Sequence, residues 1–151
     1  MRSASAQVEG LPYDVASLQA WLDPLDGLAQ VECDGMSRVV SHLLAKNGIE
    51  FVVATGLLVD LQRLNDPRVS RAESCGVTHV WVELGHGFIV DYRARMWMGP
   101  EAQHGVFIPA DGRFEYRTGN RFYFPAMPEQ LLEFVSGVQL SGWPAAPHAI
   151  A

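Results

Sequence analysis

The stretch CDGMSRVVSHLLAKNGIEFVVATG, residues 33–56, decides the fold of this chain. In its first half, apolar residues recur three and four positions apart and form one stripe, which is typical of an amphipathic helix. The expected helix begins at Cys33 or Asp34 and ends near Asn47, where a glycine follows as a typical helix stop. The second half, from Ile49, is rich in β-branched residues and predicts a long strand. Gly56 marks a bulge or a bend in that strand.

The rest of the chain downstream predicts a mostly antiparallel sheet. Residues 77–84 alternate between apolar and polar, and the turn Gly85-His86-Gly87 connects them to FIVDY, which together indicate a hairpin. Residues 62–76 are polar and are expected to form a loop. Two more strands are expected near residues 106–108 and 113–124, with turns at 111–112 and 119–120. The pattern leaves RARMWMGPE, residues 93–101, unassigned.

Upstream, a short helix is expected from Pro12, capped by Asp14 and ended by Pro24 and Gly27. A last helix is expected over PEQLLEFVSG, residues 128–137. The helices precede the strands instead of alternating with them, which indicates an α+β fold. We therefore expect N-terminal helices, including a central helix that carries Cys33, packed on a mostly antiparallel sheet.

Length and composition indicate one domain without metal or disulfide staples. A chain of 151 residues, 48% of them hydrophobic, can bury a core of its own. We expect a flexible leader over residues 1–10, a single domain over residues 11–137, and a flexible tail, rich in alanine and proline, over residues 138–151.

The charge pattern argues against nucleic acid as a partner. The net charge is −6 and Lys46 is the only lysine, so the chain lacks the basic face that a nucleic-acid binder needs. The arginines near residues 63–71 and at Arg93 and Arg95 are expected to be solvated surface.

No run approaches the ~20 apolar residues that span a membrane, so no membrane span is expected. The N-terminus lacks the apolar core of a secretory signal, so a cytoplasmic location is the default, and secretion without a signal stays open. The oligomeric state also stays open.

Cys33 is the candidate nucleophile because of its place at the start of the central helix. Free backbone N–H groups and the helix dipole favour a thiolate there. The same N–H groups can bind the oxyanion of a tetrahedral intermediate. Gly35 follows closely and lets another group, such as a substrate main chain, approach.

His79 and Asp91 are the candidate base and its orienting group. If the hairpin is centred on the 85–87 turn, position 79 lies opposite 93, and Asp91 is one diagonal step away on the same face. A carboxylate beside an imidazole selects its tautomer and stabilises its protonated form. Cys33, His79 and Asp91 together therefore predict thiol-based acyl transfer.

Two stretches resemble the transglutaminase-like (papain-like) cysteine hydrolase superfamily. CDGMSRVVSHLLAKNGIEFVVATG resembles its nucleophile helix and following strand, and THVWVELGHGFIVDY, residues 78–92, resembles its histidine-aspartate hairpin. The resemblance implies that residues 11–137 are a transglutaminase-like catalytic domain, that Cys33, His79 and Asp91 are catalytic, and that no cofactor is required. It also implies a protein or peptide substrate, because the superfamily contains transglutaminases, peptidases and protein-glutamine deamidases, besides inactive relatives.

The superfamily places a Trp or Gln near the oxyanion, upstream of the cysteine. Gln30, Gln19 and Trp21 are the candidates here, and the sequence does not choose between them. Met96 and Trp97 follow the aspartate and are candidates for a wall of the substrate cleft.

Hydrolysis of a protein amide, by glutamine deamidation or limited proteolysis, is the favoured function, and an amine acceptor would make the protein a transglutaminase.

Two other classes of function stay open. A non-enzymatic interaction module on the same fold would not need Cys33. A small redox or metal domain would use Cys33 with Cys75, which stands four residues before His79, as a disulfide or as part of a mixed zinc site. Zinc sites usually show two closely spaced ligand pairs, and this sequence has one, so no metal is predicted.

Overall fold

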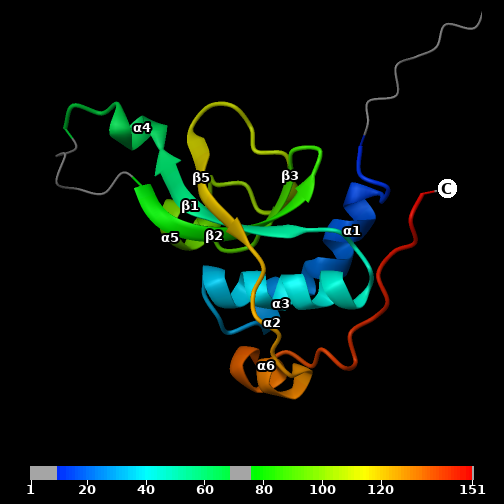
Figure 1. Ribbon diagram of the computed structural model, residues 1–151. Coiled ribbons are helices and arrows are strands. Elements are labelled where there is room, and N and C mark those ends of the chain that lie inside the picture. The colour runs from blue at the N-terminus through cyan, green and yellow to red at the C-terminus, as the bar shows by residue number, and fades with distance from the viewer. Residues whose placement is uncertain (1–9, 69–75, 151) are drawn as a thin grey trace, which may run out of the picture.

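The computed structural model describes residues 10–68 and 76–150, and it has the predicted α+β architecture. Five antiparallel strands form one sheet in the order β4-β3-β2-β1-β5. Figure 1 shows α3 lying across one face of this sheet, with α6 on the far side of α3. The strands are β1 (Val52–Asp60), β2 (Gly76–Gly85), β3 (Phe88–Asp91), β4 (Gly105–Phe107) and β5 (Phe114–Phe122). The helices in the described residues are α1 (Val15–Leu22), α2 (Pro24–Leu28), α3 (Cys33–Lys46), α4 (Leu61–Leu64), α5 (Ala94–Met98) and α6 (Glu129–Ser136).

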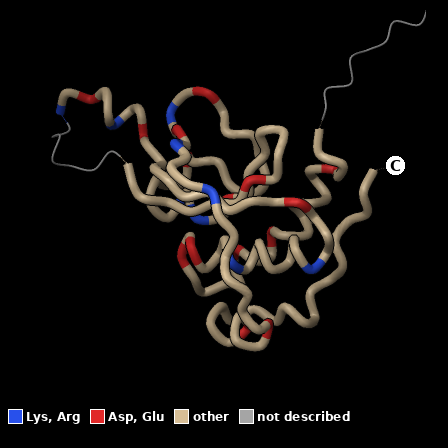
Figure 2. Tube along the Cα trace, in the orientation of Figure 1, with Lys and Arg blue, Asp and Glu red and all other residues tan. Residues whose placement is uncertain are grey.

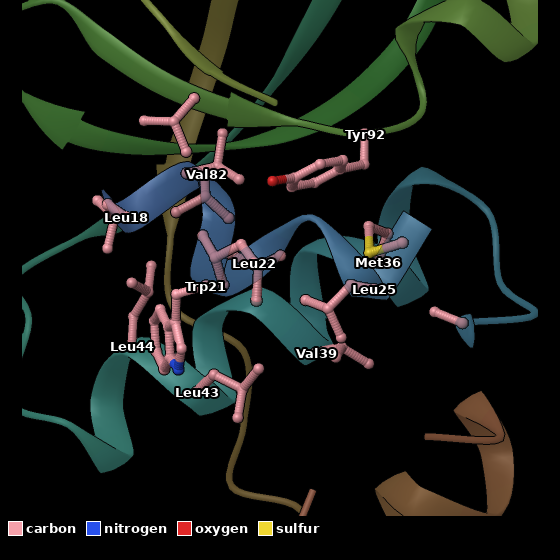
Figure 3. Packing of buried hydrophobic residues seen from close by; sticks show 14 of the residues in the cluster. Leu18, Trp21, Leu22, Leu25, Met36, Val39, Leu43, Leu44, Val82 and Tyr92 are labelled. Carbon is pink, nitrogen blue, oxygen red and sulfur yellow. The ribbon is translucent and has the colours of Figure 1, made fainter. Parts of the chain in front are cut away.

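The apolar stripe of α3 forms the centre of the main core. Its residues Met36, Val39 and Leu43 are buried together with α1, α2 and the inner face of the sheet (Figure 3). Val82 belongs to this core, whereas Trp81, the residue before it, belongs to a smaller cluster with Ala54 and Ile89. Successive strand residues point to opposite faces, so both faces of β2 are buried.

β3 is short, and its end positions the site. The observed register pairs Val82 with Val90, which is the register predicted for the hairpin. β3 ends at Asp91, so no residue of β3 pairs with His79 on that side of β2. Cys33, Val90 and Asp91 line one small void here, which shows that the start of α3 lies beside the end of β3.

Gly56 marks a bulge, as predicted. The register between β1 and β5 shifts between Thr55 and Gly56. A Cβ atom on Gly56 would lie 1.9 Å from the carbonyl oxygen of Arg117, so a residue with a side chain would push β5 away.

Several predicted boundaries are wrong. The first helix, α1, ends at Leu22, just before Pro24, as predicted, but Pro24 then begins the short helix α2 and Gly27 lies inside it. Proline is tolerated there because the N–H that it lacks has no acceptor in the first turn of a helix. The expected 62–76 loop begins with α4, which Asp60 caps by accepting from the Gln62 N–H, and its residues 69–75 lie outside the described part. No turn forms at residues 119–120, because β5 continues through them beside the bulge.

The segment after α6 is packed, although its composition suggested a flexible tail. Val138 and Leu140 are fully buried in the main core. The Trp21 indole donates a hydrogen bond to the Pro144 carbonyl, at 2.8 Å, and the Ile150 N–H donates to the Pro12 carbonyl. The predicted end of the domain at residue 137 is therefore too early. The expected leader lies outside the described residues, except for Gly10.

Candidate active site

Cys33 is the first residue of α3, and its side chain is partly exposed. The preceding Glu32 gives the helix no side-chain cap. Among residues 10–68 and 76–150, the backbone N–H groups of Cys33 and Asp34 have no hydrogen-bond partner. The thiol therefore stands beside free donors and at the positive end of the helix dipole.

Gly35 is needed for a different reason from the one expected. A Cβ atom on Gly35 would lie 2.6 Å from Cβ of Val31, inside the loop before the helix. The close approach is therefore made by the chain itself, at the turn that leads into α3.

His79 and Asp91 form a buried pair. The His79 Nε2 atom lies 2.7 Å from Oδ2 of Asp91, and neither side chain is more than 2% exposed. The observed register puts Asp91 opposite Trp81, one diagonal step from His79, as the hairpin analysis predicted.

The second ring nitrogen of His79 remains for Cys33. Burial would lower the pKa of His79, but the hydrogen bond to the Asp91 carboxylate, its charge and the nearby Cys33 thiol raise this pKa to about 9. No atom of the described residues lies in full hydrogen-bonding geometry with Nδ1. The thiol is thus near the ring without a well-aligned hydrogen bond, as is common in unliganded active sites. A histidine with this pKa is an imidazolium at neutral pH and can stabilise a thiolate.

Asp91 is held by four hydrogen bonds, all of which it accepts. Oδ1 accepts from the N–H groups of Arg93 and Ala94 at 2.9 and 3.0 Å. Oδ2 accepts from His79 and from the Tyr116 hydroxyl, each at 2.7 Å. A carboxylate that only accepts is the ionised form that an imidazolium partner requires.

Tyr116 was not among the predicted site residues. Burial, together with the charge of Asp91 and the hydrogen bond to it, raises the pKa of Tyr116 above its ordinary value, so the hydroxyl remains a donor. Tyr116 lies on β5, three strands from β3 in the sheet. No local signal in the sequence could identify it, because only the strand order brings it to Asp91.

Trp81 holds the ring of His79 in the core. The two rings are stacked with centroids 6.1 Å apart and planes 24° apart, and Tyr116 packs edge-on against Trp81 at 5.1 Å. The site histidine is therefore enclosed by aromatic side chains on one side and bound by Asp91 on another.

Arg93 connects the end of β3 with the segment before Cys33. Its side chain is about 10% exposed, contrary to the expected solvated surface, whereas Arg95 is exposed as expected. The guanidinium donates to the carbonyls of Ala29 and Val31 at 2.8 and 2.7 Å and to Asp26 at 2.9 Å. A hint lay in the sequence, because Arg93 comes directly after a buried strand.

The three oxyanion candidates lie in different parts of the fold, and only one of them is near Cys33. The Gln19 amide oxygen accepts from the Val106 N–H at 3.0 Å, so this side chain is engaged with the edge strand β4. Trp21 packs in the core near Leu43 and Leu44 in the last turns of α3 (Figure 3). Ten helical residues separate Leu43 from Cys33, which corresponds to roughly 15 Å. Gln30 alone of the three lies in the segment that leads to Cys33 and lines a cleft there.

This cleft has a volume of about 540 Å³. Gln30, Val31 and Glu32 line it, and so does Met96 of α5. Tyr92 and Arg93 line both this cleft and the void beside Cys33, so the two are adjacent. Met96 therefore lines a cleft near the thiol, as expected, whereas Trp97 is about half exposed and is not part of its lining.

The redox alternative stays a prediction, and the metal alternative can be compared only with the described residues. No group of three or more His, Cys, Asp or Glu side chains in residues 10–68 and 76–150 is placed to hold a metal ion. Cys75, on which the disulfide and zinc alternatives depend, lies outside the described residues. In the part of the chain that the structure describes, no helix has the length and apolar character to cross a membrane.

Fold and site together define an α+β domain in which a thiol at a helix N-terminus, an imidazole and a carboxylate come together. No family model matches this chain, and no curated protein and no solved structure matches it either.

Proposed function

We propose that the protein is a cysteine-dependent acyl-transfer enzyme that hydrolyses a protein amide. The observation that carries this proposal is the buried His79, which binds Asp91 through Nε2 and leaves Nδ1 for the thiol of Cys33 at the start of α3. This arrangement does more than pack the core. The raised pKa of His79 and the uncapped N-terminus of α3 both favour a thiolate at Cys33.

The first half of the reaction forms a thioester. The Cys33 thiolate attacks the amide carbonyl carbon, and the oxyanion of the tetrahedral intermediate accepts hydrogen bonds from the N–H groups of Cys33 and Asp34. The His79 imidazolium gives its Nδ1 proton to the leaving nitrogen, and the carbon–nitrogen bond breaks. Asp91 keeps the ring oriented and stabilises its charge before the proton leaves.

The second half releases the acid. Neutral His79 takes a proton from water through Nδ1, and the water oxygen attacks the thioester carbonyl. The carbon–sulfur bond then breaks, which restores the thiolate–imidazolium pair. A glutamine side chain as substrate would yield glutamate and ammonia, and a peptide bond would yield two chains.

The test is the alkylation rate of Cys33 by iodoacetamide across a range of pH, read by mass spectrometry, for wild type and His79→Ala. We expect Cys33 to react well below the ~8.5 pKa of a free thiol, and His79→Ala to move that reactivity to higher pH. Cys33→Ala shows the background from Cys75. An alkylation profile that is unchanged in His79→Ala would refute the proposal.

If Cys33 is activated, the class of reaction is determined with casein and a glutamine-rich peptide as test substrates. Ammonia release without new chain ends identifies a deamidase, and new chain ends identify a protease. Incorporation of a labelled primary amine identifies a transglutaminase. Loss of each signal in Cys33→Ala is the control.

A further inference from the structure

The Asp91 carboxylate uses all of its acceptor positions. An ionised carboxylate offers about four lone-pair sites on its two oxygens. Oδ1 accepts from two backbone N–H groups that follow β3, whereas Oδ2 accepts from Nε2 of His79 and from the Tyr116 hydroxyl, each at 2.7 Å. His79 and Tyr116 therefore share the negative charge of one oxygen atom.

The Tyr116 hydroxyl is needed neither to hold Asp91 in place nor to fill space. The two backbone N–H groups already orient the carboxylate through Oδ1. The ring of Tyr116 packs against Trp81 and Phe107, and a phenylalanine ring would make the same contacts. Phenylalanine would lack only the donor to Oδ2, so the hydroxyl acts on the charge of Asp91.

The groups that can titrate or carry charge around the His79 ring come from different elements. They are Asp91 at the end of β3, Cys33 at the start of α3 and Tyr116 on β5. Formation of the proposed thioester removes the contribution of the Cys33 thiol. In that intermediate, Asp91 therefore holds the proton on His79, and Tyr116 binds the same carboxylate oxygen.

The two halves of the proposed reaction make opposite demands on His79. The thiolate requires an imidazolium beside it, whereas the attack of water requires a neutral ring that accepts a proton at Nδ1. Without a second donor on Oδ2, Asp91 would favour the imidazolium more strongly, because a nearby negative charge stabilises the protonated ring. The ring would then stay charged at neutral pH and the release of the acid would slow.

We propose that Tyr116, as a positioning residue, shares Oδ2 of Asp91 with His79 and so limits the hold of Asp91 on the imidazolium, which lets the ring act as a base in thioester hydrolysis. The inference rests on the proposed function, and it adds the residue that balances the two halves of the reaction.

The experiment follows the titration of the His79 ring by NMR, in the full chain with isotope-labelled histidine, and assigns its signal with His79→Gln. We expect His79 to bind its proton about fivefold more tightly in Tyr116→Phe, so the midpoint of the titration moves to higher pH. If the hydroxyl merely held Asp91 in place, its loss would weaken the bond to His79 and move the midpoint to lower pH. A midpoint that falls or does not change overturns the inference.

Two further proteins serve as controls. Tyr123 lies just beyond β5 and is 65% exposed, so Tyr123→Phe should leave the midpoint of His79 unchanged. Replacement of Tyr116 by meta-fluorotyrosine keeps the hydroxyl and makes it a stronger donor, so the midpoint should move to lower pH than in wild type. This second replacement also provides the test if Tyr116→Phe does not fold, and a midpoint at or above that of wild type would contradict the inference.

The consequence for the reaction is measured with p-nitrophenyl acetate, an activated ester that acylates thiols and releases a coloured phenolate. We expect Tyr116→Phe to keep the initial burst, which reports formation of the thioester, and to lower the steady rate near neutral pH by about two- to fivefold. The difference should close at pH values above the midpoint. An equal loss of burst and steady rate would show that Tyr116 supports the whole site instead of this balance.

Failure of this inference is distinguishable from failure of the proposed function. If His79→Ala leaves the iodoacetamide profile of Cys33 unchanged, the proposed function itself has failed. If that profile shifts as expected but the midpoint of His79 does not rise in Tyr116→Phe, only the role of Tyr116 has failed.

Discussion

At the scale of single residues, the site depends on how Asp91 is held. Four donors surround its carboxylate, two from the backbone that follows β3 and two from His79 and Tyr116. Since the backbone donors orient Asp91, the carboxylate can orient His79 although both groups are buried.

The raised pKa of His79 predicts a pH-dependent stability. The pKa of about 9 in the folded protein exceeds the ordinary histidine value of 6.5, so protonation of His79 stabilises the fold fully below about pH 6.5. This contribution, roughly 3 kcal/mol, is lost as the pH rises to about 9. We expect the free energy of unfolding in urea to fall over that range in wild type and to fall much less in His79→Gln.

The exposed His86 supplies the control for this measurement. His86→Gln should keep the wild-type pH dependence, and Cys33→Ala should weaken it, because the thiol contributes to the raised pKa. An undiminished pH dependence in His79→Gln would show that another group titrates.

At the scale of elements, Arg93 joins the end of β3 to the segment between α2 and α3. Its contacts with Ala29 and Val31 hold the main chain that leads into Cys33. The position of the Cys33 thiol relative to the β2–β3 hairpin therefore depends on Arg93, which follows the end of that hairpin.

Replacement of Arg93 by methionine should cost roughly 3 kcal/mol of stability, because carbonyl groups that it satisfies would be left without a donor. Arg95→Met, two residues away and exposed, loses one hydrogen bond, to the Ala102 carbonyl, and should cost only about 1 kcal/mol. Urea unfolding measures both. In folded Arg93→Met, we also expect slower alkylation of Cys33 near neutral pH than in Arg95→Met. Equal stabilities of the two variants would argue against this role of Arg93.

At the scale of the whole molecule, the sheet order and the C-terminal segment complete the domain. Tyr116 of β5 reaches past β1 to the rings of His79 and Trp81 on β2. The segment after α6 returns past α3 toward α1 (Figure 1). Figure 2 shows acidic and basic residues spread over the trace, and no basic stripe is visible in that view.

The packed C-terminal segment predicts a large cost for a substitution within it. Leu140 is fully buried and Ile150 is 62% exposed. Leu140→Ala should lower the free energy of unfolding by about 2–5 kcal/mol. Ile150→Ala should change it by less than about 0.5 kcal/mol. Similar small effects of both substitutions would mean that residues 138–150 do not stabilise the domain in solution.

Local patterns predicted much of this fold. The helix from Cys33, the hairpin with its register and the bulge at Gly56 all follow from spacing and turn residues close together in the chain. The His79–Asp91 contact belongs with them, because a two-stranded hairpin determines its own diagonal neighbours.

The sequence by itself thus determined the α+β class, the α3 helix and the hairpin, since each depends on interactions over short separations along the chain. Tertiary structure alone decided that Tyr116 binds Asp91, that Arg93 holds the segment before Cys33, that Gln30 and not Trp21 lies by the cleft, and that residues 138–150 pack on the core. Most of these contacts join residues that are distant in sequence, and the others depend on which polar groups the fold buries. Neither can be recognised from residues that are neighbours in the chain.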